Sequence, residues 1–262
     1  MTQPLPQEEF EKRANNIADN PNTATTATSI EAVFRATEIL AERNQHADRR
    51  IVYDALKVET DSSPDRFSPG QSVRIASYFA DMHRRSIQPE SMDEAFEMLN
   101  SALADNNIDV TDLTGMERAE FLQARSQMHY RVQDYAKCIE DLQEAIDYAE
   151  RHPGTITPKW EALHWESLAS PLIEHGEDPS ETLNGWESRI AELQAPAHDR
   201  SLSMLMLVKA QIAMSRNELE SAMSFVTRGL QLAGDLPHAR EYYTAPLISL
   251  EAAIEKRQQE SA

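Results

Sequence analysis

Apolar residues recur along almost the whole chain at the spacing of an amphipathic helix, i, i+3, i+4 and i+7. Between Ser29 and Leu56 this pattern predicts two helices, with Ser29 as the N-cap of the first. We find no run of alternating apolar and polar residues that would indicate a strand. The pattern therefore predicts an all-α fold. The other expected helices lie near residues 7–19, 71–86, 91–106, 116–132, 134–151, 158–175, 180–193, 200–216, 218–233 and 237–259.

Short breaks separate most of these helices, and short loops force neighbouring helices to lie antiparallel. Residues 59–70 differ, because they hold two prolines, three serines and three acidic residues, which is the composition of a linker. The expected organisation begins with a short helix and polar segment at 1–28, an irregular helical hairpin at 29–58 and the linker at 59–70. Helical repeats at 71–235 and a capping helix and tail at 236–262 complete it.

A nine-residue pattern recurs in the predicted repeat region. It begins at Ala95, Cys138 and Ala222, in steps of 43 and 84 residues, with a degenerate copy from Thr182. Each copy reads small, apolar, two variable residues, aliphatic, two variable residues, small, aliphatic. Small side chains at fixed spacing allow two antiparallel helices to approach to about 8 Å. The recurrence therefore predicts stacked helical hairpins.

These copies resemble the tetratricopeptide repeat family. Gln133-Asp134-Tyr135 forms the expected turn before the small residue Cys138, and Asn217-Glu218-Leu219 lies at the matching place before Ala222. The steps here, 40 to 44 residues, exceed the family's unit of ~34. The resemblance implies a right-handed solenoid of antiparallel helical hairpins, whose first helices line a concave groove. Longer repeats are also similar to those in the sensor arms of bacterial regulators.

The resemblance also implies which residues face that groove. It places Glu120 there, together with nine residues that we expect to bind a ligand or partner. The family's chaperone-binding branch holds a terminal carboxylate with Lys and Asn, which these positions lack, so that specificity is excluded. The nine expected binding residues are Gln123, Gln127, Tyr130, Arg131, Glu166, Ser170, Met204, Gln211 and Met214.

Methionines in the last repeat have two interpretations, because a thioether suits both a core and a promiscuous peptide groove. Met206 and Met223 match packing positions and are expected in the core, whereas Met204 and Met214 fit either interpretation. Cys138 occupies a small-residue position and is therefore expected to be buried and unreactive.

Composition narrows the function classes. The chain of 262 residues has 44 acidic and 25 basic residues, a net charge of −19, which repels nucleic acid and anionic membranes. Seven glycines and one cysteine disfavour Gly-rich phosphate loops, an internal disulfide framework and a Cys-based zinc site. The longest apolar run, Met204–Val208, is far shorter than the ~20 residues of a spanning helix. We expect a cytoplasmic, bacterial protein that binds no metal or cofactor.

No catalytic motif is present, and paired carboxylates carry little meaning in so acidic a chain. The sequence therefore predicts a non-catalytic scaffold that binds a peptide or a partner protein, the charge favouring a basic one. The alternative is a regulatory sensor that holds a signalling peptide or small molecule inside the superhelix. An arginine cluster at Arg43, Arg49 and Arg50 is the one feature that would suit DNA, and the acidic N-terminal region argues against it. Homodimerisation is a further expectation, since terminal repeats expose apolar faces.

Overall fold

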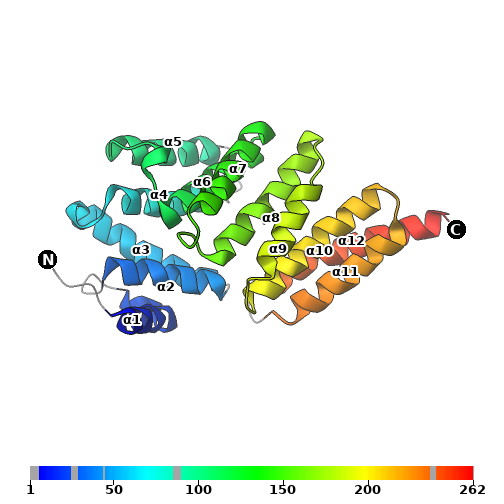
Figure 1. Cartoon of the computed structure of the whole chain (residues 1–262), viewed down its shortest axis with the longest axis horizontal. Helices are drawn as coiled ribbons and strands as arrows, with labels where there is room; N and C mark the ends of the chain where they lie inside the picture. The colour runs from blue at the N-terminus through cyan, green and yellow to red at the C-terminus, as the bar shows by residue number, and fades with distance from the viewer. Residues whose placement is uncertain (1–5, 25–28, 44, 85–89, 237–239, 262) are drawn as a thin grey trace. The chain divides into compact units, whose positions relative to one another are not determined.

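The computed structural model describes residues 6–24, 29–43, 45–84, 90–236 and 240–261 (Figure 1). These residues form helices and connecting turns, and none of them lies in a strand, so the all-α prediction is confirmed. Three short 3-10 helices, Pro21–Thr23, Pro64–Arg66 and Val110–Asp112, join longer ones. The α-helices are α1 (Gln7–Asp19), α2 (Ile30–Glu42), α3 (His46–Ser62), α4 (Pro69–Arg84), α5 (Glu90–Asp105), α6 (Gly115–Arg131), α7 (Tyr135–Arg151), α8 (Pro158–His175), α9 (Ser180–Ile190), α10 (Ala197–Ser215), α11 (Leu219–Gly234) and α12 (Arg240–Ser261).

Local sequence signals explain where several helices begin and end. The Asp134 side chain accepts a hydrogen bond from the Lys137 backbone N–H and so caps α7. Gly176 ends α8 in the left-handed conformation, φ +87°, which a residue without a Cβ adopts without strain. Ser29 precedes α2 as predicted, but its hydroxyl bonds to the Glu31 carboxylate and makes no side-chain cap. Residues 87–89, which separate the helices predicted at 71–86 and 91–106, and Pro237, where the last predicted helix begins, lie outside the described residues.

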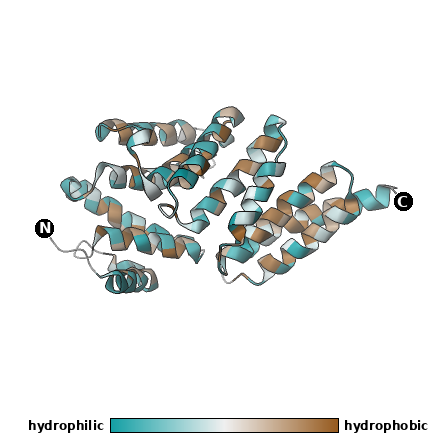
Figure 2. Cartoon of the chain, viewed as in Figure 1, coloured by the Kyte–Doolittle hydropathy of each residue, from teal (hydrophilic) through white to brown (hydrophobic). Residues whose placement is uncertain are grey.

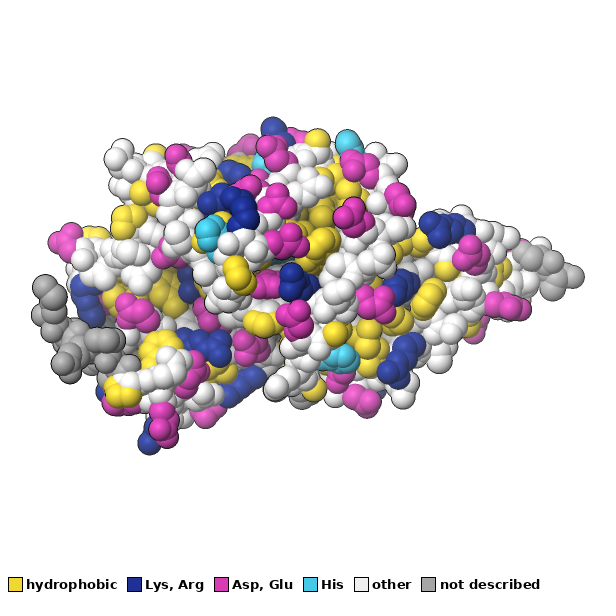
Figure 3. All heavy atoms as spheres, in the orientation of Figure 1, with side chains coloured by type: hydrophobic (Ala, Val, Ile, Leu, Met, Phe, Trp, Pro, Cys, Tyr) yellow, Lys and Arg dark blue, Asp and Glu magenta, His cyan; other side chains and the backbone are white. Residues whose placement is uncertain are grey.

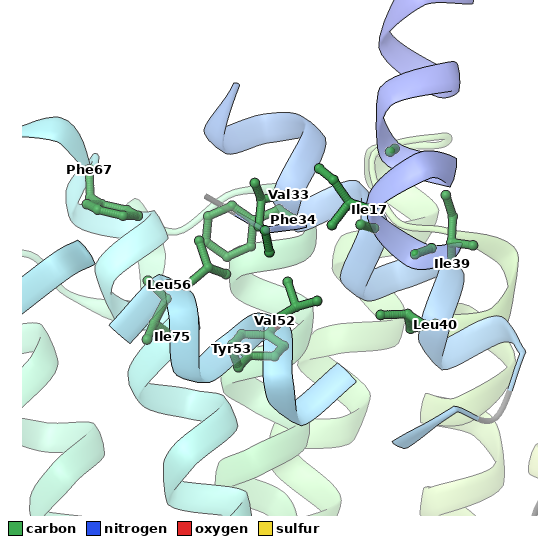
Figure 4. Close-up of a cluster of buried hydrophobic side chains, with 14 residues drawn as sticks. Ile17, Val33, Phe34, Ile39, Leu40, Val52, Tyr53, Leu56, Phe67 and Ile75 are labelled. Atoms are coloured by element: carbon green, nitrogen blue, oxygen red, sulfur yellow. The ribbon is translucent and has the colours of Figure 1, made fainter. Parts of the chain in front are cut away.

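The chain divides into two compact units, Met1–Met128 and His129–Ala262, with the boundary inside α6. In the first unit, α1 packs on α2, α2 on α3, α3 on α4, and α4 on α5. Its core draws side chains from α1 to α4, and Figure 4 shows Ile17, Phe34, Tyr53 and Ile75 turned toward one another from these four helices.

Residues 59–70 belong to this packed unit. Residues 59–62 complete α3, residues 64–66 form a 3-10 turn, and α4 begins at Pro69. Phe67, Glu59 and Gly70 are buried. The segment that composition marks as a linker is therefore a tight connection whose one aromatic residue enters the hydrophobic core, and the boundary between the two units lies at Met128 instead.

In the second unit each helix packs on its neighbour in sequence from α7 to α9 and from α10 to α12. Helix α10 also contacts α8, α9 and α12. Most helices carry one apolar and one polar side (Figure 2), so that each helix buries a stripe of side chains between its neighbours.

The repeated pattern marks buried positions. Its first small residues, Ala95, Cys138 and Ala222, are fully buried on α5, α7 and α11, as are the aliphatic residues that follow four positions later. A Cβ on Gly229 of α11 would lie 2.9 Å from the Leu247 side chain of α12. In the degenerate copy on α9 the close approach occurs at Gly185, where a Cβ would lie 2.7 Å from the Trp165 ring of α8. Small residues thus set the distance between packed helices.

Candidate functional site

The predicted binding residues are divided between the units. Gln123 and Gln127 lie on the part of α6 that belongs to the first unit, Gln123 buried and Gln127 half-buried. The other seven belong to the second unit, on the last turn of α6 and on α8 and α10. Most of the candidate site therefore lies within the second unit.

Tyr130 and Arg131 end α6. Tyr130 is half-buried against the apolar cluster around Cys138 and Leu168, and its ring centroid lies 5.6 Å from that of Tyr135. Burial raises the pKa of Tyr130, and the nearby Glu174 carboxylate adds to the effect. Arg131 is exposed. An aromatic ring with one accessible side suits an anchor in a protein contact.

Glu166 of α8 forms an ion pair with Arg200 of α10, with 3.1 Å between Oε2 and Nη2. Arg200 is 5 % exposed, and it hydrogen-bonds to the Tyr243 side chain of α12. Burial lowers the pKa of Arg200, but Glu166 and Tyr243 outweigh burial, so that the pKa is raised and Arg200 stays charged. The contacts of Glu166 with Arg200 and of Arg200 with Tyr243 therefore join α8, α10 and α12, and the charge of Glu166 is compensated by Arg200.

The faces of α8 and α10 that carry the other candidates meet at this pair. With 100° per residue, Met204, Gln211 and Met214 project within about 40° of Arg200 around the α10 axis. By the same geometry Ser170 projects within about 40° of Glu166 around the α8 axis. Gln211 is exposed, while Ser170, Met204 and Met214 are half-buried. Helical geometry thus groups Met204, Gln211 and Met214 on the Arg200 side of α10 and Ser170 on the Glu166 side of α8, with Gln211 and Met214 about 16 and 21 Å along the axis from Arg200.

The four methionines of α10 and α11 differ in how deeply they are buried. Met206 is 8 % exposed within a core cluster, as predicted, and Met223 packs at the edge of another. Met204 and Met214 are only partly buried against these clusters, so part of each side chain faces outward. Arg257 of α12 donates a hydrogen bond to the Met214 carbonyl, 3.2 Å, and so satisfies an acceptor at the end of α10.

A buried ionic network in the first unit is the feature that sequence reasoning missed. Glu120, expected on the groove wall, is 4 % exposed and accepts hydrogen bonds from Tyr53 Oη at 2.8 Å and Arg74 Nη2 at 2.9 Å. Arg49 lies 3.3 Å from the same carboxylate. Arg74 also contacts Glu38 of α2 at 3.0 Å. Helices α2, α3, α4 and α6 are therefore joined through one charged cluster.

Aromatic rings enclose this cluster. Tyr53 and Tyr78 stack with centroids 3.8 Å apart, and the Arg49 guanidinium lies 5.2–5.3 Å from both centroids. Arg74 lies 4.6 Å from the Phe34 ring centroid. Burial raises the pKa of Tyr53 to about 12, and Glu120 contributes because a second negative charge beside it is unfavourable. Glu120 and Arg74 are buried at the centre of the network, and the Arg49 side chain, 13 % exposed, lies at its edge.

The arginines considered above for DNA binding, Arg43, Arg49 and Arg50, each lie beside an acidic side chain. Arg43 pairs with Asp19 at 2.7 Å, Arg50 pairs with Asp54 at 2.9 Å, and Arg49 faces Glu120. Acidic side chains are spread over the surface seen in Figure 3 and do not gather in one patch. Each arginine of this cluster therefore has a carboxylate beside it, which offsets the charge that it would offer to a phosphate backbone.

Two side chains of reactive types, the Cys138 thiol and the His129 imidazole, lie in the second unit. Cys138 is fully buried as predicted, and burial raises the pKa of its thiol to about 12. His129 Nε2 lies 3.9 Å from Asp141 Oδ2, beyond hydrogen-bond distance. Within the described ranges, no group of three His, Cys, Asp or Glu side chains is arranged to hold a metal ion. No described helix is long and apolar enough to cross a membrane.

Comparison with protein-family models, with curated proteins and with solved structures found no match to this chain.

Proposed function

We propose that the chain is a non-catalytic scaffold, a right-handed solenoid of helical hairpins resembling tetratricopeptide repeats, that binds an extended peptide or partner protein. The observation that carries the proposal is the meeting of the candidate faces of α8 and α10 at the Glu166–Arg200 pair. First helices of successive hairpins lie side by side in such a solenoid, and contacts of α10 with both α8 and α12 suit that arrangement.

The side chains on these faces of α8 and α10 favour a partner that presents an apolar side chain and an extended backbone with free N–H and C=O groups. Met214 and Met204 offer partly accessible thioethers that adapt to varied side chains. Gln211, exposed on the same side of α10, and Ser170, half-buried on α8, can exchange hydrogen bonds with an extended peptide backbone. The net charge of −19 favours a basic partner in the cytoplasm and raises the rate of encounter more than the final affinity.

The test is selection of a phage-displayed random peptide library on the folded chain, followed by calorimetry of synthetic peptides. We expect selected peptides to be enriched in Lys or Arg around an apolar residue. The variants Met214→Ala and Gln211→Ala should each weaken binding about tenfold, with helical circular dichroism unchanged. Val58→Ala, at an exposed apolar position of α3, is the matched control and should bind like wild type.

Binding that is equally strong in all three variants would reject the α8–α10 face. A small molecule released in equimolar amount from the purified chain on denaturation, and detected by mass spectrometry, would favour the sensor hypothesis over the scaffold.

A further inference from the structure

Helix α12 has two unlike sides. Tyr243, Leu247 and Ile254 are buried, and α12 packs on α11 and α10 (Figure 1). With 100° per residue, a second stripe of residues projects from the opposite side of the helix. Every residue of this stripe is exposed: Glu241, Ala245, Ile248, Ser249, Ala252 and Lys256.

The exposed stripe suits another helix. Ile248 is 54 % exposed and the flanking Tyr242 is 73 % exposed, two of the large apolar side chains most open to solvent. Ala245, Ser249 and Ala252 are small, so a second helix axis can approach to about 8 Å, with Ile248 filling the groove between them.

The stripe is also complementary to itself. The point between Ile248 and Ser249 is equally distant along the chain from Ala245 and Ala252, and equally distant from Glu241 and Lys256. When two such helices lie antiparallel about a two-fold axis through that point, Glu241 of each copy faces Lys256 of the other. Lys256 is 78 % exposed and can turn toward an approaching carboxylate.

From this symmetry of shape and charge, we infer that a second copy of this chain docks on α12, as an antiparallel pair of α12 helices. The stripe is about 23 Å long at 1.5 Å per residue, and a contact of that length buries on the order of 1,000 Å² in total. That area is below the size of a standard stable interface, so the dimer is reversible and its population depends on concentration.

Sedimentation equilibrium of the full chain at about 0.15 M salt tests the pairing, because repulsion between the two acidic chains is then screened beyond ~8 Å. Wild type should pass from monomer to dimer as concentration rises. Ile248→Glu should raise the dissociation constant at least tenfold. Val58→Glu, which places the same charge at an exposed apolar site of α3, should leave it unchanged.

Charge reversal distinguishes the antiparallel α12 pair from non-specific association. Glu241→Lys and Lys256→Glu should each weaken the dimer several-fold, although Glu241→Lys makes the chain less acidic. The double variant keeps the wild-type net charge and restores the opposite-charge pairs, so it should recover wild-type association. Overturning results are a wild type that stays monomeric at all concentrations, an Ile248→Glu variant that associates like wild type, or a double variant that fails to recover.

Discussion

A carboxylate leaves water at low cost only where cations and hydrogen-bond donors replace the water. Glu120 meets that condition through Arg49, Arg74 and the Tyr53 hydroxyl. The same partners determine how Tyr53 ionises, since the tyrosinate would lie in a desolvated site beside a negative charge. Individual residues of the network therefore control a measurable pH dependence.

Tyr53 should make the first unit lose stability in alkali. Its pKa is raised from 10.0 to about 12, first by burial and then by Glu120. The folded state keeps the proton while the unfolded state releases it, so the free energy of unfolding falls as pH rises from 10 to 12. Urea midpoints by circular dichroism at pH 7 to 11 measure this fall. Tyr53→Phe should lower the midpoint at pH 7 but give a shallower alkaline slope; an unchanged slope would contradict the assignment.

Cys138 should resist thiol reagents in the native chain. The thiolate is the reactive form, and a pKa raised from 9.0 to about 12 reduces its fraction at pH 8 about a thousandfold. The side chain is also fully buried. Labelling with a chromogenic disulfide should be slow without denaturant. It should be rapid in urea, because unfolding exposes the cysteine to the reagent. Rapid labelling of the folded chain would show that α7 opens readily at this position.

Contact between helices depends on small residues in this fold, and Gly185 gives the sharpest case. A Cβ there would lie 2.7 Å from the Trp165 ring, so Gly185→Ala forces α8 and α9 apart or displaces the ring. Overpacking of this kind costs about 1–3 kcal/mol, although alanine is intrinsically the better helix former. Tryptophan fluorescence in urea measures the loss, since Trp165 is at the contact.

Gly234 of α11 is the matched control. Its nearest neighbour to a built Cβ is an arginine side-chain atom at 3.9 Å, and its φ is not in the left-handed region. Gly234→Ala should therefore be neutral or stabilise by up to about 1 kcal/mol. Equal destabilisation by both substitutions would show that the Trp165 contact is not the cause, because Gly234 has no such contact and alanine is the better helix former at either position.

The sequence was most informative about elements. The helix predicted at 7–19 matches α1. In the three clear copies of the repeat the first small residue and the aliphatic residue four positions later are buried, because helical periodicity and close packing are local requirements. The segment at 59–70 differed because composition measures average polarity, whereas one residue, Phe67, supplies the tertiary anchor. Hydrophobic periodicity could not predict which helices pack together when they are not neighbours in the sequence.

The candidate site was predictable only in part. Helical spacing groups Met204, Gln211 and Met214 on one face of α10, and no partner is needed to infer this. That Glu166 pairs with Arg200, and Glu120 with Arg74, depends on contacts between residues 34 and 46 positions apart. Acidic residues are so frequent here that neither carboxylate stands out in the sequence.

At the scale of the whole chain, the two units differ in their natural probes. Trp160, Trp165 and Trp186 all lie in the second unit, while the ionic network around Glu120 lies in the first. Tryptophan fluorescence therefore reports on the second unit alone, and circular dichroism at 222 nm reports on the helices of both. A variant that damages only the first unit can be identified by comparing the two signals.

Glu120→Ala is that variant. It leaves Arg74 and Arg49 buried without this carboxylate, and breaking a buried pair in this way costs about 3–5 kcal/mol. We expect the urea midpoint by circular dichroism to fall, with an early loss of part of the helical signal, while the midpoint by tryptophan fluorescence changes little. Glu150→Ala, at an exposed site of α7, is the control. It should change the free energy of unfolding obtained from either signal by no more than about 0.5 kcal/mol. If both signals fall together in Glu120→Ala, the two units unfold as one cooperative structure and the expectation of independent unfolding is wrong.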